Sequence, residues 1–152
     1  MSLKLRYAVA IGAAIACAVP ASAQVKPDVL VKQRQSAMVL MGKYFYGHLR
    51  PVAQGKLPYD AAVVSRNVGY IDALSKMPWD GFDASTKGIK SRATGAIHSD
   101  AAKWKQEQDR FQAEVTRLAE VTRKGDEAAI KSQILAVNKT CSSCHDDFRE
   151  RQ

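Results

Sequence analysis

Cysteine is scarce in this chain, and the signals of β-structure are almost absent. Three cysteines occur in 152 residues, and no stretch sustains the alternation of apolar and polar residues that is typical of a strand. No internal repeat and no low-complexity tract is visible. The lack of strand signals excludes a sheet-based architecture and predicts an all-α fold.

Blocks of basic residues and long hydrophobic runs are missing as well. The formal net charge is +8, and the basic residues are spread along the chain, which argues against a nucleic-acid-binding patch. A cationic surface of this kind can steer an acidic partner, or it can simply be solvated. The apolar run over residues 7–19 is too short to span a bilayer comfortably.

The first 23 residues have the pattern of an export signal. Lys4 and Arg6 make the start basic, the apolar run follows, and the small residues up to Ala23 fit a cleavage site. Loss of these two basic residues lowers the formal net charge from +8 to +6, and residues 24–152 remain as one domain. We therefore expect a periplasmic protein that has no membrane segment after cleavage.

Cys17 lies within the apolar run and would be lost with the signal. A lipoprotein acylated at Cys17 is the alternative. The other two cysteines lie in the segment Cys141-Ser142-Ser143-Cys144-His145, which has the C-x-x-C-H pattern of covalent haem attachment. The two-residue gap places the sulfurs about one helical turn apart, so that each thiol can add to one vinyl group. His145 can then offer a ring nitrogen to the iron.

Two other readings of the cysteine pair stay open. A redox dithiol normally opens a helix in a βαβ setting, and no strand pattern surrounds this pair. A structural zinc ion needs four ligands, and the remaining histidines, His48 and His98, are far away in the sequence. We expect those two histidines to be ordinary polar residues. Because haem of this type is attached outside the bacterial cytoplasm, the export signal supports the haem reading.

Four segments show the periodicity of amphipathic helices. They are expected to begin near Pro27, Asp60, Ser99 or Asp100, and Asp126, and the first three are expected to end at Pro51, Pro78 and Gly125. Short links at residues 51–59 and 125, with a longer irregular one from Pro78 to Ile97, predict an antiparallel four-helix bundle.

The inner faces of these segments decide where a haem could lie. Their residues are Val31, Arg34, Met38, Met41, Phe45 and His48/Leu49; Val64, Val68, Ile71 and Leu74; Trp104, Gln108, Phe111, Val115, Leu118 and Thr122; and Ile130, Ile134, Val137, Cys141, Cys144 and Phe148. Since both cysteines of the motif lie on the apolar face of the last segment, the covalent haem is expected in the bundle core.

A C-x-x-C-H motif on the last of four helices resembles the cytochrome c′ family, the class II c-type cytochromes. The resemblance covers essentially all of residues 27–151. Class I cytochromes have the motif near the N-terminus instead. Further matching segments are Arg34-Gln35-Ser36-Ala37-Met38, Pro58-Tyr59-Asp60-Ala61-Ala62, Pro78-Trp79 and Cys144-His145-Asp146-Asp147-Phe148-Arg149. The resemblance implies one covalent haem c.

The resemblance also implies a five-coordinate, high-spin iron, with His145 on one side and a bulky apolar residue over the open face. Met38 occupies the matching position. An iron of this kind binds nitric oxide or carbon monoxide, or exchanges single electrons with a redox partner that the sequence does not identify. Some relatives use a methionine of the first helix as a sixth ligand, so a low-spin electron carrier ligated by Met38 is the alternative. Packing of Met38 away from the haem is a third reading.

Arg34 lies one turn before Met38 on the same apolar face, where a charge is costly unless it is paired. The family has an arginine at this position near a haem propionate, a bidentate partner, and Gln35 can add a hydrogen bond. The alternative is that Arg34 reaches out to solvent. Arg149, four residues after His145, is expected on the proximal side of the haem, or else at the surface. Two loop aromatics, Trp79 and Phe82, are expected to cover a haem edge or to close the bundle.

The resemblance finally implies a homodimer that meets through the first two helices. Off the inner faces, an apolar patch could be formed by Val39, Tyr44, Tyr46 and Val63. An enzyme is a third functional class, because an open haem site could support nitric oxide reduction or peroxidase chemistry. The sequence shows no distal His/Arg pair to assist with protons, and we expect a protein that is not an enzyme.

Overall fold

The structure is a computed structural model that describes residues 25–151, so the expected signal peptide and Cys17 lie outside the described part. Nearly all of its regular structure is helical. The elements are α1 (Pro27–Met41), the π-helical η1 (Gly42–Leu49), α2 (Arg50–Ala53), α3 (Ala61–Leu74), the 3₁₀ turns η2 (Trp79–Phe82) and η3 (Ala84–Thr86), α4 (Ala96–Ser99), α5 (Ala101–Lys124) and α6 (Glu127–Phe148).

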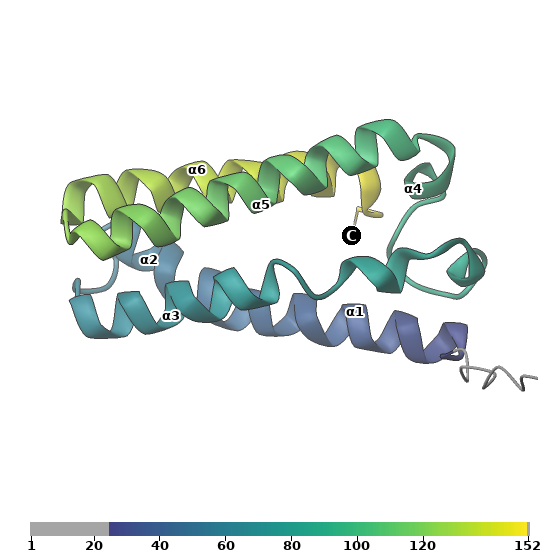
Figure 1. Cartoon of the computed structure of the whole chain (residues 1–152), viewed down its shortest axis with the longest axis horizontal. Helices are drawn as coiled ribbons and strands as arrows, with labels where there is room; N and C mark the ends of the chain where they lie inside the picture. Colours follow the sequence, from purple (N-terminus) through teal and green to yellow (C-terminus); the bar gives the residue numbers. More distant parts are fainter. Residues whose placement is uncertain (1–24, 152) are drawn as a thin grey trace, which may run out of the picture.

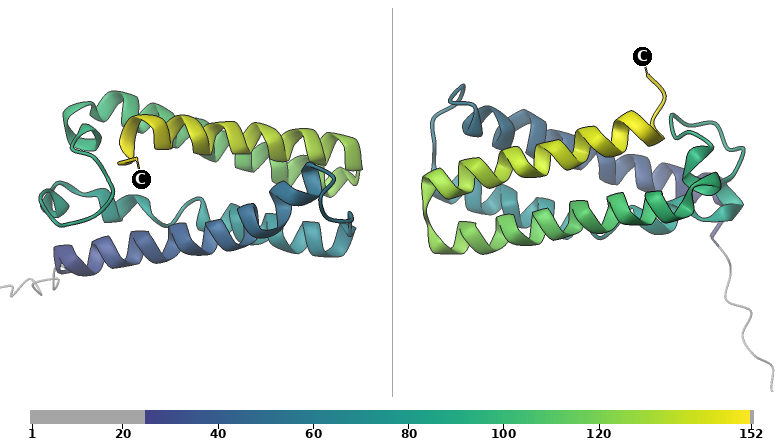
Figure 2. Two further views of the ribbon diagram at one scale, coloured as in Figure 1. Left: turned by 180° about the vertical axis from the view of Figure 1, so that it is seen from behind. Right: turned by 90° about the horizontal axis from the view of Figure 1, so that it is seen from above.

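The four long helical segments form an antiparallel bundle, which confirms the predicted all-α fold. The first is the continuous run α1-η1-α2, and α3, α5 and α6 are the others. Helices α1 and α3 lie side by side in one layer and α5 and α6 in the other (Figure 1), and both turned views keep this arrangement (Figure 2). Between residues 25 and 151 no helix is long and apolar enough to cross a membrane.

Aspartates at the helix N-termini explain where three of the helices begin. Asp60, Asp100 and Asp126 each accept a hydrogen bond from the backbone N–H three residues later. This satisfies one of the donors that a helix N-terminus leaves free, and it typically stabilises a protein by about 1 kcal/mol. Gly125, with φ of 79°, ends α5 in the left-handed conformation that glycine adopts without strain. The predicted beginnings of these helices are thereby confirmed.

The prediction that Pro51 ends the first helix is wrong. The chain passes from η1 into α2 and remains helical to Ala53. Pro51 thus lies inside a continuous helical run, where it lacks an N–H donor, and the wider π-helical segment η1 immediately precedes α2. The second helix also differs, because it ends at Leu74, before Pro78.

The core lies between the two layers. Its buried residues are Phe45, Leu49, Val52, Val64, Val68, Ile71, Phe111, Val115, Leu118, Ile130, Ile134 and Val137. Removing one such side chain from water contributes roughly 1.5–3 kcal/mol to folding. Apart from Val52, these residues belong to the predicted inner faces, as the helical period requires.

The long connection between α3 and α5 closes one end of the bundle. An isolated bridge pairs Ala93 with Arg149. Next to it, the N–H of Thr94 donates to the carbonyl oxygen of Phe148 at 3.0 Å, and the N–H of Glu150 donates to that of Arg92 at 2.8 Å. These bonds fix the connection against the C-terminal end of α6, where the motif is located (Figure 1).

Candidate haem site

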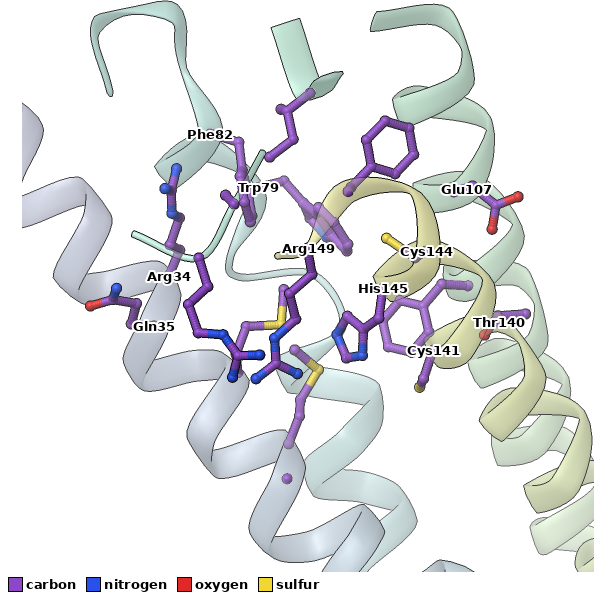
Figure 3. A pocket seen from close by; sticks show the side chains of 18 of the residues that line it. Arg34, Gln35, Trp79, Phe82, Glu107, Thr140, Cys141, Cys144, His145 and Arg149 are labelled. Atoms are coloured by element: carbon purple, nitrogen blue, oxygen red, sulfur yellow. The ribbon is translucent and has the colours of Figure 1, made fainter. Parts of the chain in front are cut away.

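A cavity of about 620 Å³ lies at the end of the bundle that carries the motif. Helices α1 and α6 form opposite walls (Figure 3), and the lining also includes residues of η1, α3, η2, α4, α5 and the connection at residues 91–93. The lining is predominantly apolar. Cofactor pockets usually measure about 300–1,000 Å³ and are lined mostly by apolar side chains, so the size and character of this cavity suit a cofactor.

The two cysteines and the histidine of the C-x-x-C-H motif all line this cavity. Cys141 lies on α6 one turn before the adjacent residues Cys144 and His145 (Figure 3), and both cysteines are free thiols. Burial raises the pKa of Cys141 to about 11. It also raises the pKa of Cys144 to about 12, with the carboxylate of Glu107 as the next cause. Both groups are therefore protonated thiols at neutral pH.

His145 is half-buried in the same wall. Burial lowers the pKa of its imidazole, and the positive charges of Arg149 and Arg92 lower it further. The imidazole is therefore neutral at neutral pH, the form that ligates a metal. The two arginines belong to the lining as well, which places Arg149 beside the imidazole (Figure 3). Arg92, in the long connection, was not singled out in the sequence.

Arg34 is buried, with only 5% of its surface exposed. Its Nη1 donates to the carbonyl oxygen of Gly81 at 2.6 Å and to the hydroxyl of Thr86 at 3.3 Å, and its Nη2 donates to the hydroxyl of Ser91 at 2.9 Å. Burial lowers the pKa of the guanidinium. The alternative in which Arg34 reaches into solvent is wrong, because the surrounding loop encloses it.

Arg34 nevertheless belongs to the cavity lining. Its guanidinium lies over the ring of Phe82, at 4.4 Å from the ring centre. Three of its five N–H donors are used by the loop, which leaves two donors uncommitted. Gln35 lines the cavity from its rim and is exposed, whereas Met38 is half-buried in the lining.

Aromatic side chains form one wall of the cavity. The ring of Trp104 lies 5.8 Å from that of Trp79, 4.7 Å from that of Phe82 and 5.1 Å from that of Phe148, measured between centres. The indole N–H of Trp79 donates to the carbonyl oxygen of Ser75 at 2.6 Å. Trp79 and Phe82, singled out in the sequence, thus belong to the cavity wall.

Two further residues of the lining were missed in the sequence. Glu107 is buried on the inner face of α5, where Gln108 was expected. It lies between Trp104 and Phe111 at helical spacing, so the signal that marked Arg34 on the first helix could have found it. Tyr46 lines the cavity from η1. The π-helical turn shifts its phase, and no sequence period predicts that shift.

The apolar surface patch expected from Val39, Tyr44, Tyr46 and Val63 does not form as a single exposed surface. Tyr46 belongs to the cavity, and Tyr44 packs against Tyr70 with ring centres 4.7 Å apart. Val63 is half-buried. Val39 also borders the cavity and is 71% exposed, and Tyr46 is 37% exposed.

The other histidines lie outside the cavity lining. Within residues 25–151, no group of three or more His, Cys, Asp or Glu side chains is placed to hold a metal ion.

A sequence model of the family described as cytochrome c′ matches residues 29–149. The chain belongs to the cytochrome c′ family. Proteins of this family have a covalently attached haem c, and Cys141 and Cys144 fit its attachment. The cavity described above also fits this group, because it combines two thiols, a neutral imidazole and several guanidinium groups in an apolar chamber.

Individual members of the family are similar to this chain over most of their length. The cytochrome c′ of Alcaligenes xylosoxydans xylosoxydans is 39% identical over 127 residues, which are 84% of this chain and 98% of the relative. The crystal structure of cytochrome c′ from Rubrivivax gelatinosus has a TM-score of 0.78 and 39% identity, covering 82% of this chain and 98% of the other. A nitric oxide complex of a variant of cytochrome c prime from Alcaligenes xylosoxidans has a TM-score of 0.78 and 38% identity, covering 85% and 99%.

Proposed function

We propose that this chain is an exported, periplasmic haem protein that binds nitric oxide or carbon monoxide and exchanges single electrons with a redox partner. When attached, the haem supplies the iron at which a gas or an electron is held. Cys141 and Cys144 provide the two thioether links, and His145 provides the axial nitrogen. Binding, rather than catalytic turnover, is the proposed activity.

The observation that carries the gas-binding proposal is the position of Met38. It lines the cavity from α1, whereas His145 lines it from the opposite wall, α6. A methionine side chain is large and adaptable, and it packs well in irregular apolar space. We propose that Met38 fills the space over the open face of the iron without binding to it, so that a small neutral gas can displace it. A variant of a relative with 38% identity is known as a nitric oxide complex, which supports the gas-binding part of this proposal.

The charged residues of the lining have roles in holding the haem. Arg34, a residue of the lining, has two N–H donors that the loop does not use, and we propose that they bind a propionate, with Gln35 adding a hydrogen bond at the rim. Arg149, beside the imidazole, acts on the proximal side, where its charge favours a neutral His145. Arg92 acts on the imidazole in the same way, so two arginines, Arg149 and Arg92, are proposed to act on the proximal side of the haem.

The mature protein is proposed to be a homodimer that meets through α1 and α3. The exposed apolar residues of this region include Leu40 on α1 and Tyr70 on α3, and Met77 follows α3. A shallow groove runs beside them, lined in part by Leu40, Leu74 and Met77. An exposed apolar surface of this kind is typical of an interface.

Optical spectra and carbon monoxide binding test the gas-binding proposal. The ferrous wild type should be high-spin and should bind carbon monoxide. Met38→Ala removes most of the side chain over the iron, so the association rate should rise, because the gas no longer displaces a packed group. Met41→Ala is the matched control, since Met41 also lines the cavity one turn later, and its rate should change much less.

A different result would favour the alternative function, a low-spin electron carrier with Met38 as an iron ligand. A ferrous wild type that is low-spin and ignores carbon monoxide, together with a high-spin Met38→Ala variant, would identify Met38 as the sixth ligand. The gas-binding proposal would then be wrong.

A further inference from the structure

Glu107 is an acidic residue in an apolar cavity whose other charged lining residues are arginines. It lies on the inner face of α5, and 8% of its surface is exposed. Among the described residues that line the cavity it is the only acid, against Arg34, Arg92 and Arg149. Figure 3 shows it on α5 beside the part of α6 that holds Cys144.

The carboxylate is poorly compensated within the protein. Its Oε1 lies 3.7 Å from Nη1 of Arg110, whose side chain is 54% exposed. Its Oε2 is fully buried and has no hydrogen-bond partner among the described residues. A buried carboxylate oxygen without a partner costs free energy, whereas an exposed arginine is screened by water and compensates little. Stability alone does not explain a glutamate at this position.

Glu114 provides a comparison within the same helix. It lies two turns after Glu107 and is likewise paired with the arginine three residues later, at 3.6 Å from Arg117. Glu114 does not line the cavity, and its Oε2 accepts a hydrogen bond from Gln133. The two glutamates therefore differ in the features that matter here, proximity to the cavity and an uncompensated oxygen.

We infer that Glu107 is a positioning charge that stabilises the ferric form of the haem through the edge attached at Cys144, and so keeps the reduction potential low. The ferric haem has one positive charge more than the ferrous form. A nearby negative charge attracts that extra charge, and the attraction is strong because the cavity is apolar and the carboxylate is buried. Charge and burial near a haem are established means of setting its potential.

Replacement of the carboxylate by a neutral group of the same shape tests the inference. In the haem-loaded protein, Glu107→Gln should raise the reduction potential, so that the ratio of ferrous to ferric protein in a fixed redox buffer increases roughly three- to tenfold. Glu114→Gln, the matched control, should leave this ratio nearly unchanged. Glu107→Asp keeps the charge and should stay close to the wild type.

A second neutral variant guards against a folding defect. Glu107→Leu suits the apolar face of α5, so it should fold, load haem and raise the potential in the same direction. An unchanged potential in both neutral variants, or an equal shift in Glu114→Gln, would overturn the inference. These outcomes are independent of gas binding, because the potential is measured without a gas and haem loading is verified by the absorption spectrum.

Discussion

Arg34 and Gly81 are joined by side-chain hydrogen bonding and by close backbone approach. Nη1 of Arg34 donates to the carbonyl oxygen of Gly81 at 2.6 Å. A Cβ atom on Gly81 would lie 2.7 Å from Cβ of Arg34 and 2.8 Å from the carbonyl oxygen of Leu30. The loop that forms one wall of the cavity is thus held directly against the backbone of α1, in a space that only glycine fits.

Gly81→Ala should therefore destabilise the protein. The added methyl group meets backbone and the inflexible base of a side chain, so the loop must move away from α1. Overpacking of this kind typically costs about 1–3 kcal/mol, which should appear as a lower denaturant midpoint at an unchanged m-value.

Gly95→Ala is the matched control, because a Cβ there meets no atom within 4 Å and its φ is −62°. Equal losses in the two variants would show that the contact between Gly81 and Arg34 is not the cause.

Arg34→Leu should lower the reduction potential of the haem-loaded protein. Loss of a nearby cation favours the ferric form, which has the larger positive charge. The change also leaves the carbonyl oxygen of Gly81 without its buried donor, at a cost of about 1–3 kcal/mol of stability. Potentiometric titration at low salt measures the first effect, and denaturant unfolding measures the second.

Lys32→Gln tests whether any lost cation on α1 has this effect. Lys32 is on the exposed face and lies 3.8 Å from Asp28, so its loss should leave the potential unchanged. A potential that does not respond to Arg34→Leu would place Arg34 away from the haem charge.

Haem retention should depend on the two thiols of α6. Acid–acetone extraction of the wild type should leave the colour with the polypeptide, and the double variant Cys141→Ser, Cys144→Ser should release haem into the organic phase. His145→Ala should keep the covalent link but lose the native iron spectrum.

His98→Ala provides the control for the last variant, because His98 lies outside the cavity lining. Its spectrum should match the wild type. A wild type that loses all its haem on extraction would contradict covalent attachment.

Charges introduced on α1 and directly after α3 should weaken the proposed dimer. The double variant Leu40→Glu, Met77→Glu should sediment as a monomer at micromolar concentration, because the like charges would be buried without partners. Leu135→Glu is the control, since Leu135 is similarly exposed but lies on α6. A wild type with the monomer mass alone would remove the dimer.

The helix beginnings and the haem motif could be predicted because they depend on neighbouring residues. Asp60, Asp100 and Asp126 accept hydrogen bonds from N–H groups three residues away, an interaction that needs no other part of the chain. The spacing of Cys141, Cys144 and His145 is equally local, since an α-helix places residues three or four apart on one face.

The cavity charges and the path of the first helix depended on the tertiary structure. Residues on one face of a helix are three or four positions apart, so after Trp104 either Glu107 or Gln108 could have lain on the inner face of α5. In the packed structure Glu107 is the buried one. The π-helical turn carried Tyr46 into the cavity and the helix beyond Pro51, since one widened turn changes the phase of every later residue. The partners of Arg34 lie 47 to 57 positions away in the chain. Neighbouring residues alone specify where three of the helices begin and which residues form the haem motif, whereas contacts between distant segments decide which charges line the cavity.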